Sequence, residues 1–480
     1  MTKATIPQKG LPKDEVLRAL EDFRHKDVPW REGKAFGYVF DAKHEALEAG
    51  KKAYLAFLSE NGLDPTSFPS LLRLENDVVR MCASHVHGGP GVVGNFTSGG
   101  TESIILAMKA ARDWARVHRP EVKTPRILAP ITAHAAFHKA AHYLGVTIDT
   151  FAADPETHRA DVAAGRAAIT PDTIALIGSA PSYAHGVIDD IPALASLAKE
   201  HGLWFHVDAC MGGVLLPFME KLGESVAPFD FRVENVWSLS MDLHKYGFCP
   251  KGASVVLYRD KGLRKHQIYA CAEWTGYTIV NAAVQSSKSG GPLAAAWATM
   301  MCMGEDGYLG LTKAMRDATH RYAEGIAAIP GLRLLASPDM TLIAFTSDDL
   351  HVFHLPDLMK KRGWYIQPQL GFGPHRENVH LSVTSANVPH VDAFLRDLAA
   401  SVQEARLLPK DAALKEMAAM ASQIDPAKLD DEAFARLLSL AGMQGAGVPE
   451  TSADINMLLQ ELPRPLVKAI LVQFLNELFD

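Results

Sequence analysis

Hydrophobic residues between Leu71 and Leu257 recur in two alternating patterns. Short runs rich in β-branched residues predict strands, and the stretches between them carry apolar residues at the spacing of amphipathic helices. The predicted strands span residues 127–128, 146–151, 174–177, 203–207, 236–239 and 255–257. Because strands that alternate with helices favour right-handed crossovers, this region is expected to form a mostly parallel sheet covered by helices.

Outside this region the pattern predicts three further parts. We expect a helical N-terminal arm at 1–70, whose apolar content is too low for independent folding, and a large domain at 71–290. A smaller α/β domain is expected at 291–408 and a helical extension at 409–480. Within the smaller domain, strands are predicted at 332–336, 341–346 and 378–383 around a helix at 350–362.

The last predicted helix has a marked apolar stripe. The stripe consists of Leu466, Val467, Ile470, Leu471, Phe474, Leu475, Leu478 and Phe479. Its polar face carries Glu461, Glu477 and Asp480 and few lysines, whereas helices that lie on membranes are rich in lysine and arginine. Packing against the body of the protein, or across a dimer, is therefore favoured over membrane attachment.

Composition narrows the class of protein. A chain of 480 residues, of which 48% are hydrophobic, can bury a large core. The formal net charge of −7, without clusters of Lys and Arg, argues against a nucleic-acid surface. Small molecules are the expected partners.

The cysteines and the N-terminus suggest a compartment. The five cysteines are odd in number and never form a Cys-x-x-Cys pair, so neither a disulfide framework nor a metal site is predicted. The first thirty residues lack the apolar core of a signal peptide, and no later run approaches the roughly 20 apolar residues that a transmembrane helix needs. We expect a cytoplasmic protein without a transmembrane segment.

The segment Ser-Leu-Ser-Met-Asp-Leu-His-Lys-Tyr-Gly, at 238–247, carries the strongest candidate for chemistry. Lys245 has the apolar neighbours Trp237, Leu239, Met241, Phe248 and Cys249, a setting that predicts a lowered lysine pKa and a nucleophilic amine. Asp208 ends a buried strand, where a carboxylate needs a cation or a strong donor. The pair can hold pyridoxal phosphate, with Lys245 on the aldehyde carbon and Asp208 on the pyridine nitrogen. Taken singly, Lys245 can also be a surface charge and Asp208 a loop or cap residue.

Four further positions have two interpretations each. Residues 97–103, Thr-Ser-Gly-Gly-Thr-Glu-Ser, lead into an apolar helix and either bind a phosphate at its N-terminus or form an ordinary cap. His134 follows a predicted strand and either stacks on a flat ring or caps a helix. His206 orients Asp208 or belongs to the core, and His244 contacts a phosphate or stands in a turn.

Five segments together resemble the fold type I, aspartate aminotransferase-like enzymes that depend on pyridoxal phosphate. They are Thr-Ser-Gly-Gly-Thr-Glu-Ser at 97, His-Ala-Ala-Phe at 134, Pro-Ser-Tyr-Ala-His-Gly-Val-Ile-Asp at 181, His-Val-Asp-Ala-Cys-Met-Gly-Gly at 206 and Ser-Met-Asp-Leu-His-Lys-Tyr-Gly-Phe-Cys-Pro-Lys-Gly at 240. Within that group, residues 30–405 look most like the sphingosine-1-phosphate lyases and more distantly like the group II amino-acid decarboxylases. The resemblance implies a mostly parallel seven-stranded sheet covered by helices and a smaller C-terminal α/β domain.

The resemblance also implies a role for each matching residue. The implied catalytic residues are Lys245, Asp208, His134 and Tyr183. The implied contacts to pyridoxal 5'-phosphate are Ser98, Gly99, Gly100, Thr101, His134, Asp208, His244 and Lys245, with Gly290 and Gly291 from the second subunit of a homodimer. The implied substrate contacts are Lys251, Tyr38 and Tyr183, with Lys251 matching a lysine that helps bind a substrate phosphate.

The implied reaction is retro-aldol cleavage of a phosphorylated sphingoid base to a long-chain aldehyde and phosphoethanolamine. The alternatives are an amino-acid decarboxylase, for which Arg376 would be the substrate-gripping cation, and a non-catalytic pyridoxal-binding protein, which the intact Lys245 argues against. The sequence departs from the lyase pattern at 61–69, a segment in which the lyases usually carry a histidine for the substrate phosphate, whereas Asp64 here would repel that group. It also departs at 273–277 and 285–291, in the approach to the partner-subunit loop, and Tyr38 matches the usual pocket tyrosine only with a shift of register.

Overall fold

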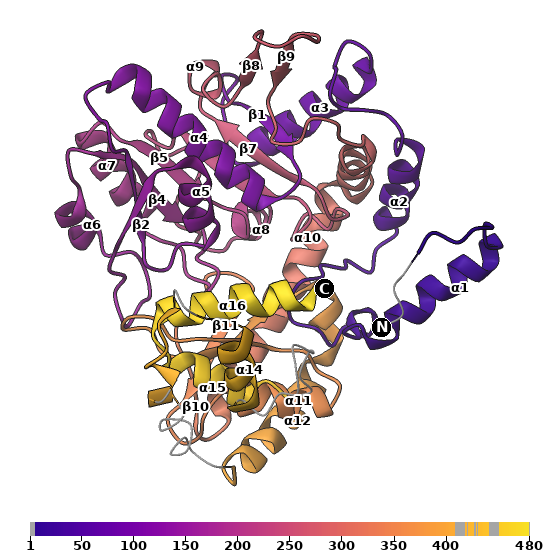
Figure 1. The fold of residues 1–480 in the computed structure, drawn as a ribbon, viewed down its shortest axis with the longest axis vertical. Coiled ribbons are helices and arrows are strands. Elements are labelled where there is room, and N and C mark those ends of the chain that lie inside the picture. The colour runs from indigo at the N-terminus through magenta and orange to yellow at the C-terminus, as the bar shows by residue number, and fades with distance from the viewer. Residues whose placement is uncertain are drawn as a thin grey trace.

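The computed structural model describes residues 5–408, 418–419, 421–426, 429, 431–440 and 451–479. Figure 1 shows a larger unit built on a central sheet and, beside it, a smaller unit that carries the C-terminal helices. A long helix, α10 (Gly291–Ala328), runs from the first unit into the second.

The larger unit contains a seven-stranded sheet in the order β1-β7-β6-β5-β4-β2-β3. Its strands are β1 (Val93–Thr97), β2 (Arg126–Pro130), β3 (Thr147–Phe151), β4 (Thr173–Ser179), β5 (Trp204–Asp208), β6 (Ser238–Asp242) and β7 (Ser254–Tyr258). The strands from β6 to β3 are parallel to one another, whereas β7 is antiparallel to both β6 and β1. The expected mostly parallel seven-stranded sheet is therefore confirmed, and each of the six predicted strands overlaps one of these.

The strand that the hydrophobic pattern missed is β1. Its sequence, Val-Gly-Asn-Phe-Thr, contains two residues that are rare in strands. Gly94 is needed nevertheless, because a Cβ there would lie 2.4 Å from the carbonyl oxygen of Val256 on the paired strand β7.

Alternating side chains of the sheet form two cores, one on each face. Leu128, Leu176 and Leu239 belong to one buried cluster, and Ile127 and Ile177 belong to the other. The helices of the larger unit are α3 (Pro69–His85), α4 (Gly100–His118), α5 (Ala136–Leu144), α6 (Val162–Ala168), α7 (Ile191–Glu200), α8 (Gly212–Lys221) and α9 (Lys261–Arg264). Helices α4 and α5 pack on the second face, while α3, α7 and α8 pack on the first.

The smaller unit contains a four-stranded antiparallel sheet in the order β10-β11-β13-β12. Its elements are β10 (Leu332–Leu334), β11 (Leu342–Ser347), α11 (His354–Lys361), β12 (Gln367–Gln369), β13 (Asn378–Ser382) and α12 (Val391–Ala405). The three strands and the helix expected here are present. The missed strand β12 is a polar edge, Gln-Pro-Gln, without an alternating apolar pattern.

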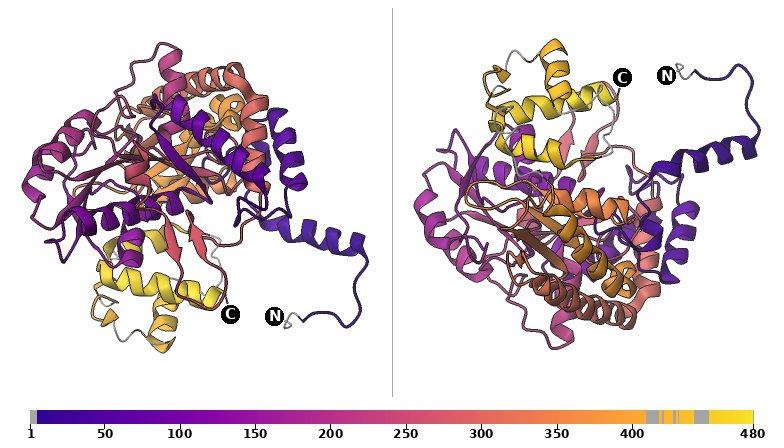
Figure 2. Two further views of the ribbon diagram at one scale, coloured as in Figure 1. Left: turned by 90° about the horizontal axis from the view of Figure 1, so that it is seen from above. Right: turned by 90° about the horizontal axis from the view of Figure 1, so that it is seen from below.

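The N-terminal segment divides between exposed and packed parts. Helix α1 (Lys13–Phe23) has no buried residue and extends away from the body in two directions of view (Figures 1 and 2). Helix α2 (Ala46–Ala56) packs along α10, and the intervening Phe36 is fully buried in the core of the smaller unit. The remaining short elements are η1 (Arg24–Lys26), η2 (Trp30–Glu32), η3 (Ser385–His390) and the hairpin of β8 (Tyr269–Cys271) and β9 (Ile279–Asn281).

The C-terminal helices are α14 (Asp431–Leu440), α15 (Ala453–Glu461) and α16 (Arg464–Leu478). The predicted apolar stripe packs only in part: Leu466 and Val467 are buried against α15, whereas Leu471, Leu475 and Phe479 are exposed. Within the described ranges, no helix is both long and apolar enough to cross a bilayer.

Candidate active site

A cavity of about 410 Å³ opens where β4, β5 and β6 end at the N-terminus of α4. This is the edge at which open α/β sheets bind ligands. Nine predicted site residues line it together: Ser98, Gly99, Gly100, Thr101, His134, Tyr183, Asp208, His244 and Lys245. Segments that are separated by up to 147 positions in the sequence therefore meet at one place.

Lys245 lies in this cavity beside a carboxylate that the sequence analysis did not single out. Its Nζ is 2.9 Å from Oδ2 of Asp242, which is 2% exposed. The expected lowering of the Lys245 pKa is wrong. Burial does lower it, but the negative charge of Asp242, with smaller contributions from Cys210 and Asp208, outweighs burial and raises the pKa of Lys245 above its ordinary value.

Asp242 is held in place by the same pairing. Burial would raise the pKa of the Asp242 carboxyl, yet the positive charge of Lys245 keeps it below its usual value. Its second oxygen, Oδ1, has no hydrogen-bond partner among the described residues and faces the first turn of α4, where a Cβ on Gly100 would lie 2.9 Å away. Glycine at position 100 lets the positive end of the helix approach this carboxylate.

Asp208 lies at the C-terminal end of β5 and is 7% exposed. Its Oδ1 accepts hydrogen bonds from the backbone N–H of Cys210 at 3.0 Å and from the hydroxyl of Ser240 at 3.4 Å. The Ser240 hydroxyl also lies 3.3 Å from Nε2 of His206, whose Nδ1 is 2.8 Å from the Ser238 hydroxyl. His206 therefore reaches Asp208 through Ser240, which favours its orienting role over that of an unconnected core histidine.

The glycine-rich segment at the N-terminus of α4 has features of both a helix cap and an anion-binding site. Glu102 acts as the cap, accepting the backbone N–H of Ser98 at 2.6 Å through one oxygen and that of Val284 at 2.6 Å through the other. In the described part of the chain, no hydrogen bond uses the backbone N–H groups of Gly99, Gly100 or Thr101. These three donors therefore remain available to an anion at the helix N-terminus.

Tyr183 and His134 form the opposite wall of the cavity. The Tyr183 hydroxyl donates to Oε1 of Gln367 at 2.6 Å, and its ring lies 4.3 Å from the ring of His380. Burial raises the pKa of Tyr183, so the phenol stays protonated near neutral pH. His134 is exposed, and its ring centroid lies 6.3 Å from that of Tyr183 with the rings nearly perpendicular. Its Nδ1 accepts a hydrogen bond from the backbone N–H of Ala136 at 3.2 Å, at the start of α5, so the structure has the helix-capping contact.

A second cavity, of about 350 Å³, shares Ser98 and Glu102 with the first. Lys251 and Gly290 line it, as does Asp64. The Asp64 carboxylate accepts hydrogen bonds from the hydroxyl and the backbone N–H of Thr66 and from the hydroxyl of Ser67, which lower the pKa of the Asp64 carboxyl. The Asp64 side chain therefore stabilises the turn formed by residues 64–67.

Two of the predicted site residues line neither of these cavities. Gly291 begins α10 next to Gly290. Tyr38 is 63% exposed and packs against Tyr365, with the ring centroids 5.6 Å apart. Arg376, the cation considered for a decarboxylase, forms an ion pair with Asp348 and lines neither cavity.

The polar residues of the site that were not predicted as part of it include Asp242, Ser240 and Gln367. Asp242 could have been found, because it ends a buried strand three residues before Lys245, a spacing that a single turn closes. Ser240 has the same spacing from the end of β6 as His206 has from the end of β5. Gln367 reaches the site from the smaller unit, and no local pattern marks it.

The fold and the site define a class. Residues 41–348 match the family model described as the pyridoxal-dependent decarboxylase conserved domain, and residues 415–477 match one described as a pyridoxal-dependent enzyme C-terminal putative HTH domain. The chain belongs to the pyridoxal-dependent decarboxylase family, and its cofactor is pyridoxal 5'-phosphate.

Within that family the chain belongs with the sphingosine-1-phosphate lyases, and it is a lyase that depends on pyridoxal phosphate. It is 40% identical to sphingosine-1-phosphate lyase of Arabidopsis thaliana, over 84% of this chain and 74% of the relative, and 41% identical to sphingosine-1-phosphate lyase 1 of Rattus norvegicus, over 85% and 71%. The solved structure of sphingosine-1-phosphate lyase from Burkholderia pseudomallei superposes with a TM-score of 0.80 at 35% identity, over 85% of this chain and 94% of that one.

The residues of the larger cavity fit this cofactor. An amine that can form a covalent bond, a buried carboxylate on a neighbouring strand and three unbonded N–H groups at a helix N-terminus match its aldehyde, its ring nitrogen and its phosphate. The amine and the carboxylate lie at the C-terminal ends of neighbouring strands, and the N–H groups lie at the N-terminus of α4.

Proposed function

We propose that this protein cleaves phosphorylated long-chain amino alcohols of the sphingosine 1-phosphate class to a long-chain aldehyde and phosphoethanolamine. The observation that carries the proposal is Lys251. This lysine lines a cavity that shares two residues with the cofactor cavity, so a cation stands where a substrate phosphate can extend from a bound amine. The identity of about 40% to sphingosine-1-phosphate lyases supports the same substrate class.

In this proposal each residue of the larger cavity holds one part of the cofactor. Lys245 binds the aldehyde carbon, Asp208 faces the pyridine nitrogen and His134 stacks on the ring. The phosphate is bound by His244 and by the consecutive residues Ser98, Gly99, Gly100 and Thr101. Tyr183 and Tyr38 contact the substrate, together with Lys251. The proximity of these groups in one cavity supports every assignment except two: Lys251 lines the adjoining cavity, and the assignment of Tyr38 rests on the resemblance and on its position beside Tyr365.

Bound pyridoxal phosphate supplies an acceptor for the electron pair left when the bond between the amine-bearing and hydroxyl-bearing carbons breaks. Asp208 keeps a proton at the nitrogen it faces, and the backbone N–H of Cys210 together with Ser240 fixes the carboxylate for this task. Asp242 holds the Lys245 ammonium in the cavity until the cofactor binds. Tyr183, anchored by Gln367, stays a neutral phenol in the wall of the cavity, where it would be available to exchange a proton with a bound substrate.

We further propose a cytoplasmic homodimer in which the partner supplies Gly290 and Gly291. Exposed apolar side chains on the segment that approaches α4 support a dimer interface there: Tyr269, Trp274, Tyr277, Val280 and Val284. All five cysteines have free thiols, as expected in a reducing compartment. The proposed divisions remain an arm at 1–70, a large domain at 71–290, a small domain at 291–408 and an extension at 409–480, which contains the second matched family model.

A product assay tests the substrate class. The holoenzyme, incubated with sphingosine 1-phosphate, is expected to release long-chain aldehyde and phosphoethanolamine in equal amounts, because breaking one carbon–carbon bond yields both. A parallel panel of acidic and aromatic amino acids is expected to give no carbon dioxide above the level without enzyme. Carbon dioxide without aldehyde would replace the proposal with a decarboxylase.

Lys251→Ala is expected to raise KM for the phosphorylated substrate about 10- to 100-fold with little change in kcat, since a charge-assisted hydrogen bond contributes about 1.5–3 kcal/mol. Burial and the nearby positive charge of Lys245 lower the pKa of Lys251 to about 8. Its ammonium charge is therefore present below that pH and lost above it, so wild-type KM should rise as the pH passes through about 8. Lys251→Arg, which stays protonated, is the matched control and should show no such rise.

A further inference from the structure

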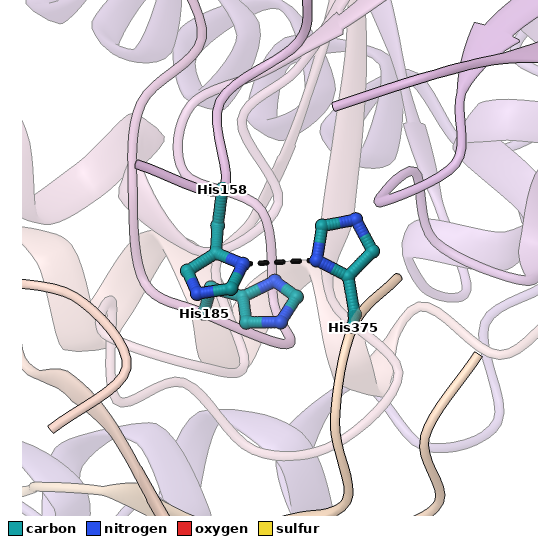
Figure 3. A group of neighbouring side chains, drawn as sticks. All are labelled: His158, His185 and His375. Carbon is teal, nitrogen blue, oxygen red and sulfur yellow. Dashed lines mark hydrogen bonds between the residues drawn. The ribbon is translucent and has the colours of Figure 1, made fainter. Parts of the chain in front are cut away.

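Three histidines meet outside the cofactor cavity. His158 lies in the loop after β3, His185 in the loop after β4 and His375 in the loop between β12 and β13. They are 4%, 4% and 7% exposed, and one ring nitrogen from each lies within 4.8 Å of the others. Figure 3 shows the three imidazoles side by side. None of them has a role in the proposed reaction.

The contacts inside the cluster leave nitrogen atoms without partners. The rings of His158 and His185 stack with their centroids 4.1 Å apart, and Nδ1 of His158 lies 2.9 Å from Nδ1 of His375 (Figure 3). Nδ1 of His185 and Nε2 of His375 are buried and have no hydrogen-bond partner among the described residues. Buried nitrogens without partners carry a desolvation cost that a bound ion would offset.

The chemistry of the cluster suits a metal ion. Metal binding requires neutral imidazoles, and burial lowers the pKa of all three histidines, that of His185 to about 3. The His158 ring also donates to the backbone carbonyl of Leu335, the kind of outer contact that orients metal-binding histidines. Zinc binds imidazole nitrogen at about 2.0–2.1 Å, which requires nitrogens about 3.4 Å apart, so the rings need to move by roughly 1 Å.

We propose that His158, His185 and His375 bind one divalent transition-metal ion of the zinc type, with a water molecule as the fourth ligand. Three neutral nitrogen donors favour zinc over calcium or magnesium, which prefer oxygen. The ion would tie two loops of the larger unit to the smaller unit. His185 follows Tyr183 by two residues, so the ion would also brace the wall of the cofactor cavity.

The test measures metal rather than turnover. The holoenzyme is treated with a chelator, incubated with zinc chloride, desalted and assayed for zinc and for its melting temperature. The wild type is expected to retain about one zinc ion per chain and to melt at a higher temperature than the chelated protein. His375→Ala and His158→Ala are expected to bind zinc at least about 100-fold more weakly, because each loses a direct ligand.

His142→Ala, which removes an exposed histidine, is the matched control and should retain the ion. Cobalt provides a measurement that needs no variant, because a tetrahedral cobalt site in the wild type gives visible absorption bands beyond the cofactor band. Failure of the wild type to retain either metal overturns the proposal. Equal zinc retention in the wild type and in the His375 and His158 variants overturns it as well, since the ion would then be bound elsewhere.

Discussion

Lys245→Ala is expected to abolish the visible absorption band of the bound cofactor and to lower kcat/KM for aldehyde release by at least about 1,000-fold, because among the residues that the structure describes no other lysine lines the cofactor cavity. The measurement combines an absorption spectrum with the aldehyde assay on protein dialysed against pyridoxal phosphate. The variant also leaves the buried Asp242 carboxylate without its cation, so a drop in melting temperature is expected.

Lys199→Ala is a suitable control for Lys245→Ala. This lysine pairs with Glu234 on the surface, and its loss should change neither the band nor the rate. A variant lacking Lys245 that kept the band, or that kept more than a few per cent of the activity, would rule out Lys245 as the residue that binds the cofactor.

Asp208→Asn is expected to lower kcat by at least about 1,000-fold while the cofactor remains covalently bound. The amide is nearly the same size, so the contacts to Cys210 and Ser240 can persist, but it carries no charge to stabilise a protonated pyridine nitrogen. The expected signature is therefore a retained but shifted visible band with a strong loss of aldehyde production. KM should change little, because Asp208 does not line the cavity that contains Lys251.

Ser240→Ala provides the graded comparison for Asp208→Asn. It removes one hydrogen bond to the carboxylate and disconnects His206, and the expected loss in kcat is about 10- to 100-fold. Wild-type kcat in Asp208→Asn would show that the carboxylate does not act on the cofactor ring.

The strands and the residues at their ends could be predicted because both depend on local patterns. Runs of buried β-branched residues identify β4, β5 and β7, and a polar residue directly after such a run, such as Asp208, marks the ligand-binding edge. Strand β1 was not predicted because it contains Gly94, which has a low strand propensity and is required by the close approach of β7. This steric requirement for glycine can be recognised only when the pairing of the two strands is known.

Other features depend on contacts that no single segment encodes. The pKa of Lys245 was expected to fall because its neighbours in sequence are apolar, but the buried Asp242 charge, a single turn away, dominates. The three clustered histidines are separated by 27 and 190 positions, so no local spacing in the sequence brings them together. Long-range pairing decides both cases.

The carboxylate of Glu102 accepts hydrogen bonds from two backbone N–H groups, one in the turn before α4 and one in the loop that follows β9. The turn and that loop are consequently joined through one side chain, although Ser98 and Val284 are 186 positions apart. Glu102 therefore connects the loop after the β8–β9 hairpin to the backbone donors at the N-terminus of α4. The hairpin exposes the apolar side chains of the proposed dimer interface, so in the proposed dimer we expect cofactor binding and subunit association to be thermodynamically linked through Glu102.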